Sequence, residues 1–497
     1  MRRATQIILI LLAVILIIQA AYSLSWPLAH DEAPLFYEAF LMQSEGRMPY
    51  RDIFDFQMPG AYAAYYLLGV ASNFGPFRIR ILDLLILAAL IVFTYLAMRR
   101  FGKPAALAGG ILFGLKYLQG GPALSLQREY LLLVFIALAL FVGLRDTLTL
   151  KHRLSLGVLF GLAGVIKPHA ALGLLPFLLF DMADLRGRPG MSLPDLAKQG
   201  ILPMGMGFLT PISLATAWLA LTGALTPFMD IALNYWPLYS QINGEMAITP
   251  PAERMSYVLN QAWRLGGSGW WLIPAALGIR LNRNRQTYLL ASLALCYAIY
   301  PALSGQFFPY HYIPFTYCIV LLASLSISTI NHPPLTVLPS FILLLTLAIS
   351  IRPSQTLLRQ LEGKSIATST NRAGEITRFL EKNLEEGDTV QPLDWTGGTL
   401  LALLHTRAPL ATSYVFDFYF YHHVSNPYIQ SIRADFMTQL QGAQPRFIIE
   451  VAAIDKPWVS GEDTSREFAE LRSFLDERYS VTMEKEDYVI YEFDDGR

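Results

Sequence analysis

Charged residues are what this sequence lacks most. Only 15% of its 497 residues are Asp, Glu, Lys or Arg, whereas a typical soluble domain carries about 25%. Hydrophobic residues make up 54% of the chain, and its mean hydropathy is +0.39. So few charges are typical of a chain that spans a lipid bilayer many times. The composition therefore predicts a polytopic α-helical membrane protein.

Three further absences narrow the function. The formal net charge is zero, which argues against nucleic acid as a partner. The two cysteines, Cys296 and Cys318, lie in apolar runs, where cysteine acts as a small hydrophobic residue. Their number and spacing offer neither a disulfide framework nor a zinc site. No glycine-rich phosphate loop opens a helix in the polar C-terminal region, so we expect no nucleotide there.

What the sequence has instead is a series of long apolar stretches. About eleven of them are long enough, or nearly so, to cross a hydrocarbon core of about 30 Å. They lie at 6–24, 79–98, 103–119, 129–145, 154–166, 169–182, 200–222, 268–280, 286–303, 311–329 and 334–351. The pair at 154–182 is short, and either two spans or a re-entrant hairpin fits it. A further apolar stretch at 60–71 is too short to span, so we expect it along the membrane interface.

Basic residues in the loops predict the orientation. With the N-terminus in the cytoplasm, the cytoplasmic loops hold more Lys and Arg than the longer outer loops, in agreement with the positive-inside rule. Eleven crossings then place the chain after 351 outside. The predicted domains are a membrane domain at 1–351, with a first outer loop at about 25–78, and an outer domain at 352–497.

The outer region is polar and mixed in its predicted structure. We expect helices at 372–384, 428–441 and 464–477, and short strands near 389–390, 446–451 and 487–492. Alternating helices and strands indicate a small α/β domain. We expect this domain to contact an acceptor or to brace the membrane part.

Four carboxylates lie in the first outer loop: Asp31, Glu32, Asp52 and Asp55. Asp31 precedes an amphipathic run, where a helix N-cap is the ordinary interpretation. The N-cap interpretation explains Asp31 alone. It does not explain why Glu32 lies beside it or why further acidic residues follow in the same loop. A carboxylate at a membrane surface stays charged and can still reach a lipid-linked substrate, so a catalytic role is the alternative. A metal site formed by the Asp31–Glu32 pair with His30 is a weaker alternative.

Candidate phosphate and sugar ligands lie on the same predicted side of the membrane. Lys167, followed by His169, ends the fifth span; it either binds a lipid phosphate or extends to the headgroups. Arg128 precedes the fourth span and could equally pair with Glu129. The segment before the tenth span is rich in aromatic residues, as is common at a membrane interface. An aromatic belt does not explain its two polar members, Gln306 and His311.

The order of these motifs resembles the GT-C superfamily of polyprenyl-phosphate-sugar-dependent glycosyltransferases. It is similar to the members that include protein O-mannosyltransferases and the lipid A aminoarabinose transferase. The resemblance covers essentially the whole membrane part. The matching motifs are His30-Asp31-Glu32, Gly46-Arg-Met-Pro-Tyr50-Arg-Asp52, Pro59-Gly60, Gln127-Arg128-Glu129, Gly161-Leu-Ala-Gly-Val-Ile-Lys167-Pro168 and Phe308-Pro-Tyr310-His311-Tyr312.

This resemblance implies an inverting hexosyl- or pentosyltransferase of the bacterial inner membrane. Asp31 matches the general base, with Glu32 as its neighbour in the catalytic pair. Cationic side chains would stabilise the leaving phosphate. The candidate substrate-binding residues are Asp52, Asp55, Arg128, Lys167, His169, Gln306, Tyr310 and His311.

The resemblance leaves the acceptor open between a glycan, a lipopolysaccharide and a protein hydroxyl. A monophosphate donor needs no cofactor, whereas family members with diphosphate donors use a divalent metal. The rival function is a transporter or flippase of a lipid-linked glycan. A transporter is expected to carry ionisable residues near the bilayer midplane, and only Asp83, near the start of the second span, partly fits that pattern.

Overall fold

The structure is a computed structural model that describes residues 2–242, 249–329, 355–362, 368–454 and 462–494, together with residues 345 and 348. Its membrane part is helical. The helices used below are α1 (Arg2–Ser23), α2 (Glu32–Ser44), α3 (Pro59–Ser72), α4 (Pro76–Met98), α5 (Lys103–Gln119), α6 (Arg128–Leu131), α7 (Leu133–Gly143), α8 (Leu150–Ile166), η3 (Pro168–Gly173), α9 (Leu174–Arg186), α11 (Leu202–Leu221), α12 (Leu225–Asp230), η5 (Ile231–Tyr235), α13 (Trp236–Ile242), α15 (Arg254–Arg264), α16 (Leu272–Leu281), α17 (Arg285–Ser304), η8 (Pro309–Tyr312) and α18 (Ile313–Ser324).

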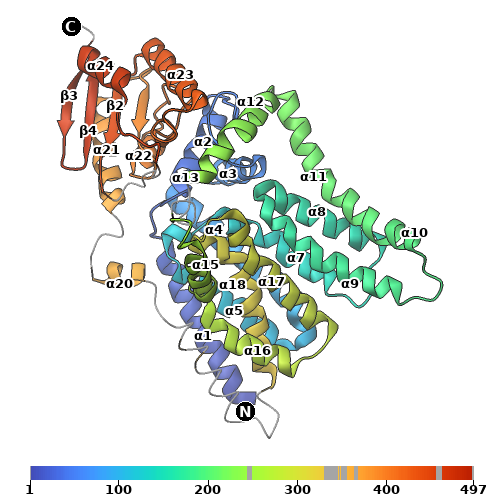
Figure 1. Ribbon diagram of the computed structural model, residues 1–497. Coiled ribbons are helices and arrows are strands. Elements are labelled where there is room, and N and C mark those ends of the chain that lie inside the picture. The colour runs from blue at the N-terminus through green and yellow to red at the C-terminus, as the bar shows by residue number, and fades with distance from the viewer. Residues whose placement is uncertain are drawn as a thin grey trace.

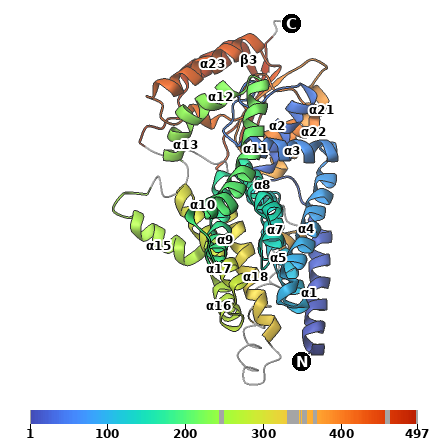
Figure 2. The same ribbon diagram turned by 90° about the vertical axis from the view of Figure 1, so that its right-hand side faces the viewer.

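The C-terminal part combines helices with one mixed sheet. Its elements are α20 (Gln355–Leu361), α21 (Thr368–Asn383), β1 (Val390–Leu393), α22 (Thr399–Thr406), η11 (Phe418–Phe420), α23 (Pro427–Ala443), β2 (Phe447–Val451), α24 (Ala469–Arg478), β3 (Tyr479–Glu484) and β4 (Tyr488–Phe493). The strand order is β1-β2-β4-β3, with β1 and β2 parallel and the other pairs antiparallel. In Figures 1 and 2 this sheet lies at the end of the molecule opposite the N-terminus.

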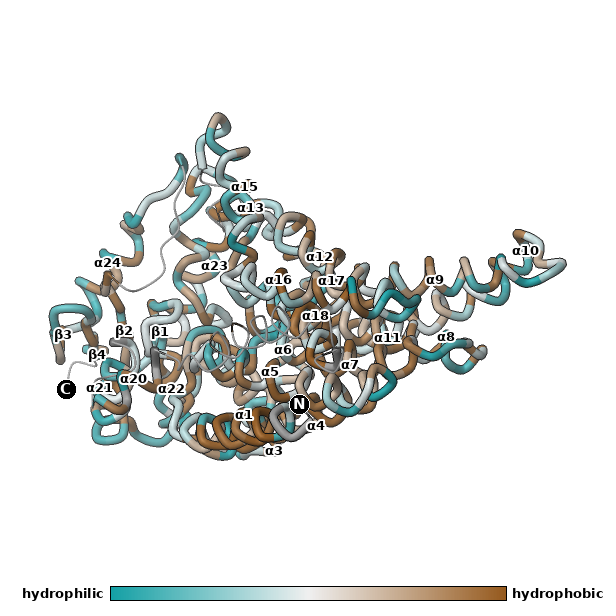
Figure 3. Tube along the Cα trace, turned by 90° about the horizontal axis from the view of Figure 1, so that it is seen from below, coloured by the Kyte–Doolittle hydropathy of each residue, from teal (hydrophilic) through white to brown (hydrophobic). Residues whose placement is uncertain are grey.

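Ten of the eleven predicted spans coincide with helices, and the eleventh, 334–351, lies outside the described residues apart from 345 and 348. Within the described residues, six helices are long and apolar enough to cross a membrane: Thr5–Ser23, Pro76–Phe101, Pro168–Arg186, Leu193–Leu221, Arg285–Ser304 and Pro309–Ile327. Figure 3 shows continuous hydrophobic stretches along α1 and α4 and more hydrophilic ones around the C-terminal sheet.

The short pair at 154–182 forms two neighbouring helices, α8 and α9. Arg153, near the start of α8, makes a buried ion pair with Asp181 near the end of α9 (Nε to Oδ2, 2.6 Å). The two helices are therefore antiparallel. On its other side, α8 packs closely on α11, because a Cβ atom at Gly157 would lie 2.1 Å from the Met204 carbonyl oxygen. Small residues permit such close helix approach in membranes.

The first outer loop, which includes α2 and α3, is fastened to the C-terminal part. The buried hydroxyl of Tyr37 donates to the Ala408 carbonyl oxygen (2.8 Å), and Arg47 donates to the Thr412 carbonyl oxygen (2.8 Å). The Phe54 N–H donates to the Ser413 carbonyl oxygen (2.8 Å). These contacts hold the C-terminal region against the loop, and they fix one wall of the pocket described next.

Four C-terminal elements escaped prediction: α20, α22, η11 and β3. The helix α22 is only eight residues long. The strand β3 is largely exposed, although Tyr479, Val481 and Met483 alternate with polar residues in the period typical of a strand, a pattern that the prediction missed.

Candidate active site

One pocket of about 400 Å³ gathers most of the predicted site residues. It lies where the first outer loop, the ends of α8 and η8, the helix α13 and the C-terminal part meet. Eight of the ten predicted residues line it: Asp31, Asp55, Arg128, Lys167, His169, Gln306, Tyr310 and His311.

Asp31 occupies the N-cap position of α2, but its carboxylate makes no capping hydrogen bond. Oδ2 accepts from Arg128 Nη2 (2.6 Å) and Oδ1 lies 2.8 Å from His30 Nδ1. Burial raises the pKa of Asp31, but the charges of His30 and Arg128 outweigh it and hold that pKa well below its ordinary value. Asp31 is therefore an ionised carboxylate at the pocket wall.

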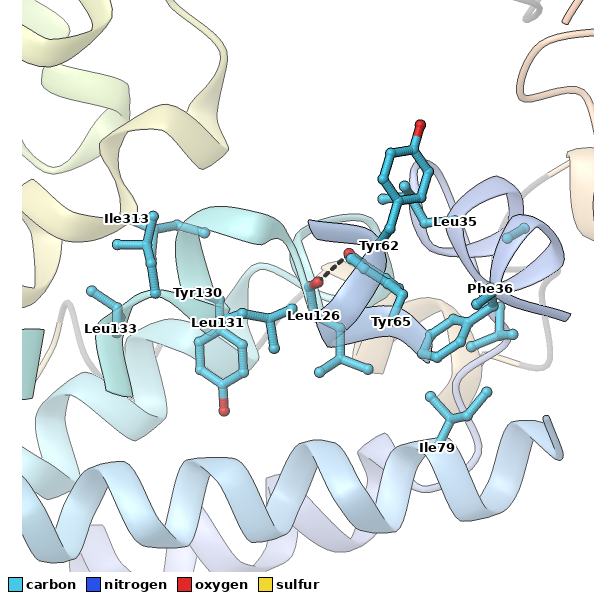
Figure 4. Close-up of a cluster of buried hydrophobic side chains, with 14 of the residues drawn as sticks. Leu35, Phe36, Tyr62, Tyr65, Ile79, Leu126, Tyr130, Leu131, Leu133 and Ile313 are labelled. Carbon is cyan, nitrogen blue, oxygen red and sulfur yellow. Dashed lines mark hydrogen bonds between the residues drawn. The ribbon is translucent and has the colours of Figure 1, made fainter. Parts of the chain in front are cut away.

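Arg128 is held by a strained turn. The preceding Leu126 has a φ of +46°, a left-handed conformation that is costly for a branched side chain. Two buried tyrosines fix this turn: the Tyr65 hydroxyl donates to the Leu126 carbonyl oxygen (2.6 Å), and the Leu126 N–H donates to the Tyr117 hydroxyl (3.0 Å). Figure 4 shows the Tyr65 bond within the surrounding apolar cluster. His30 is left-handed too, with a φ of +53°.

Lys167, at the end of α8, does not simply extend to the surface. Its Nζ lies 3.3 Å from Glu129 Oε1, and the same oxygen accepts from the Tyr300 hydroxyl (3.0 Å). Burial lowers the pKa of Lys167, while Glu129 opposes that shift. Glu129 is fully buried behind the pocket wall. Its negative charge therefore holds the charged Lys167 ammonium group at the pocket edge.

His311 lies on the other side of Glu129. Its Nδ1 donates to the Gln306 carbonyl oxygen (2.7 Å), since a carbonyl oxygen only accepts. The opposite ring nitrogen, Nε2, lies 3.5 Å from Glu129 Oε1. The backbone of Gln306 thus orients the histidine ring. Of the remaining predicted residues, His169 contacts the Tyr300 ring at 5.0 Å between centroids, and Tyr310 stacks on Phe308 at 5.4 Å.

Glu32 faces away from this pocket. Its carboxylate is fully buried and accepts from Arg80 at both oxygens (2.6 and 2.7 Å) and from Ser125 Oγ (3.0 Å). The backbone N–H of Ala29, in the same loop, also donates to Glu32 Oε2 (3.0 Å). Glu32 and Arg80 therefore form a buried ion pair that fixes the loop onto α4, and the adjacent residues Asp31 and Glu32 have separate surroundings.

The two later carboxylates of the loop also separate. Asp52 pairs with the neighbouring Arg51 (Oδ2 to Nη2, 2.7 Å) and lines a different, polar cavity between the loop and residues 411–414. Asp55 lies in the pocket wall, where it accepts from the hydroxyls of Tyr62 (2.7 Å) and Tyr419 (3.2 Å). Burial raises the pKa of Asp55 to about 6, against the opposing effect of these hydroxyl donors.

Several pocket residues were not predicted. The role of Glu129, which lies buried behind the pocket wall, was also missed, because the sequence analysis considered it only as a partner for Arg128. Gln57 accepts a hydrogen bond from Arg128 Nη1 through Oε1. The remaining wall is largely aromatic and comes partly from the C-terminal region: Trp236, Tyr239, Trp395 and Phe416. Nothing in the sequence connects these residues to Asp31.

The described part of the chain contains no group of three or more His, Cys, Asp or Glu side chains arranged to hold a metal ion.

Comparison with known proteins identifies the fold. No protein-family model and no curated protein sequence matches the chain. Among solved structures, it is similar to ArnT from Cupriavidus metallidurans bound to undecaprenyl phosphate, with a TM-score of 0.60, 12% identity and coverage of 97% of both chains. The apo form of that protein gives a TM-score of 0.58 at 12% identity, again with 97% coverage of both chains.

A third solved structure is AglB from Archaeoglobus fulgidus in complex with an inhibitory peptide and a dolichol-phosphate. Its TM-score is 0.46 at 13% identity, over 89% of this chain and 69% of that one. The ArnT matches extend over nearly the whole chain, so the predicted resemblance is confirmed at the level of the fold.

Proposed function

We propose that this protein, which has the fold of ArnT, is an inverting glycosyltransferase that moves a hexose or pentose from a polyprenyl-phosphate donor to an acceptor hydroxyl. The observation that carries the proposal is one pocket in which an ionised carboxylate, Asp31, lies beside the cations of Arg128 and Lys167. The bound undecaprenyl phosphate of the ArnT structure supports a lipid phosphate as the ligand of these cations.

Asp31 acts as the general base. A sugar or protein hydroxyl is a weak nucleophile at neutral pH, and a carboxylate within hydrogen-bond reach takes its proton as the new glycosidic bond forms. The ion pairs with His30 and Arg128 hold this carboxylate in one orientation. The anomeric carbon is attacked from the face opposite the phosphate, which gives inversion.

The leaving phosphate gains charge as its bond to the sugar breaks. Arg128 donates from a planar guanidinium that suits phosphate oxygens, while Lys167 supplies a compact positive charge. Preorganised cations in a partly buried pocket stabilise such developing charge strongly. Glu129 serves Lys167 as the counter-ion when no phosphate is bound.

The aromatic wall suits the acceptor side. Trp236 and Tyr239 come from α13, and Trp395 and Phe416 from the C-terminal part. Flat aromatic faces offer apolar contact to a sugar ring, and Thr396 adds a hydroxyl. This wall would suit each of the three candidate acceptors: a glycan, a lipopolysaccharide or a protein side chain. Asp52 belongs to the separate polar cavity, which is a place for a distal part of a long acceptor.

The proposed membrane arrangement completes this function. Eleven crossings, with α8 and α9 as two of them, place the N-terminus in the cytoplasm and residues 352–497 outside the bacterial inner membrane. Residues Pro168–Arg186 form a helix long and apolar enough to cross a membrane, and the distribution of basic residues supports both the two crossings and the orientation. The pocket then opens on the outer face, where lipid-linked sugar donors meet their acceptors.

The test compares donor turnover in membranes that contain the wild type or Asp31→Asn. We expect release of polyprenyl phosphate from the wild type and a near-complete loss in the variant. Equal turnover would show that Asp31 is not the base. A flippase would move the donor across the bilayer without releasing free polyprenyl phosphate. Activity that survives a chelator supports the monophosphate donor, and activity that is lost indicates a metal-dependent diphosphate donor.

A further inference from the structure

A second carboxylate shares the pocket with Asp31 but differs from it in every contact. Asp55 lies in the same wall, and no Lys, Arg or His in the described part of the chain forms an ion pair with it. Its oxygens accept from the neutral hydroxyls of Tyr62 and Tyr419. A carboxylate with two cationic partners holds a proton weakly, whereas one with neutral donors in a buried site holds it more tightly.

A third carboxylate lies behind Asp55. Glu38 is fully buried in α2, and neither of its oxygens has a hydrogen-bond partner among the described residues. It follows Asp31 by seven residues, so both lie on one face of that helix, two turns apart. Burial and the nearby Asp55 raise the pKa of Glu38 well above its ordinary value. Because no donor in the described part of the chain satisfies its buried oxygens, the charged form of Glu38 is disfavoured, and the pair with Asp55 carries one negative charge when Asp55 is ionised.

These positions matter because Asp31 must be free of its proton before the next turnover. We propose that Asp55 receives the acceptor's proton from Asp31 and passes it to solvent, with the protonated Glu38 behind it limiting the pair to a single charge. This inference rests on the proposed function. In each cycle the acceptor O–H bond breaks as the O–C bond forms, and the sugar–phosphate bond breaks with its electrons leaving on phosphate. The proton moves to Asp31, then through pocket water to Asp55.

The inference predicts the sign of a pH effect. Below about pH 6, Asp55 already carries a proton, cannot accept another, and turnover falls. Asp31 remains ionised in that range, so it produces no such loss. The titratable and charged groups that face Asp55 or Glu38 from the surrounding elements are Tyr50, Tyr62, Arg128, Tyr235 and Tyr419.

Removing one hydroxyl donor provides the sharpest test. Tyr62→Phe keeps the ring but deletes the donor 2.7 Å from Asp55 Oδ2, which favours protonated Asp55. Loss of one hydrogen bond to a charged carboxylate should move the acid limb up by about one to two pH units. Tyr419→Phe, which deletes a 3.2 Å contact, should move it less. Tyr37→Phe also deletes a buried tyrosine hydroxyl bond, and it should leave the limb in place.

The experiment measures donor turnover by the full-length protein in proteoliposomes between pH 5 and 8. Asp55→Asn should lower turnover by about 100-fold or more, with its thermal midpoint measured to confirm folding. Wild-type turnover that stays level below pH 6, a limb that stays in place in Tyr62→Phe, or full activity in Asp55→Asn each overturns the inference while the glycosyltransferase proposal stands. No donor turnover by the wild type at any pH overturns both.

Discussion

Glu32 offers the most quantitative prediction, because it lies beside the proposed base and is expected to have a purely structural role. The Arg80 guanidinium is fully buried and donates to Glu32, to the Trp26 carbonyl oxygen (3.2 Å) and to Ser125 Oγ (2.5 Å). Removal of one partner of a buried ion pair leaves an uncompensated charge and costs about 3–5 kcal/mol. Glu32→Ala should therefore lower the free energy of unfolding by about that amount.

The assay is denaturation of the purified protein in mixed micelles at constant detergent composition. Replacement of both partners, as in Glu32→Leu with Arg80→Met, removes the charge together with its counter-ion. That double variant should recover most of the loss, because buried ion pairs exchange for hydrophobic residues at little net cost. Turnover per folded molecule should stay within a few-fold of the wild type.

A different outcome would refute this reasoning. If Glu32→Ala is as stable as the wild type yet loses turnover, Glu32 takes part in the chemistry and its ion pair is not structural. If the double variant stays as unstable as the single one, the loss comes from packing rather than from the unpaired charge.

Three further predictions concern the carboxylates and the lysine of the pocket and its surroundings. Asp31→Asn should lower donor turnover by about 10²–10⁴-fold, as expected for loss of a general base; a loss below tenfold in a radiolabelled-donor assay would contradict that role. Lys167→Ala should raise the KM for the donor by about 10–100-fold, because a charge-assisted contact to phosphate is lost, and an unchanged KM would place the phosphate elsewhere. Glu38→Gln should gain stability relative to the wild type as the pH rises above about 4.5, because the folded wild type binds a proton that its unfolded chain releases there. Thermal midpoints of both proteins from pH 4.5 to 8 measure this difference, and a constant difference would mean that Glu38 is not protonated in the folded state.

The sequence was enough to predict the membrane helices and which residues would come together in one site. Long apolar stretches mark spans directly, and the outer ends of alternate spans must meet on one side of a bundle. That constraint, together with the resemblance, brought Asp31, Arg128, Lys167 and His311 into one predicted group although they lie far apart in the chain. The pocket contains all four.

What the sequence could not supply is which way each side chain points. Asp31 and Glu32 are adjacent, yet one faces Arg128 and the other faces Arg80. Both arginines lie far from the pair in the chain, so no local pattern distinguishes them. Glu38 looks like an ordinary polar residue of an amphipathic helix, and only the fold shows that the C-terminal region and α3 bury that face.

The most direct test of the central claim is the position of the phosphate in a structure of this protein with polyprenyl phosphate bound. The account predicts phosphate oxygens within hydrogen-bond distance of Arg128 and Lys167, with the Asp31 carboxylate facing the open pocket. A phosphate bound outside this pocket, or one held by neither cation, would contradict it.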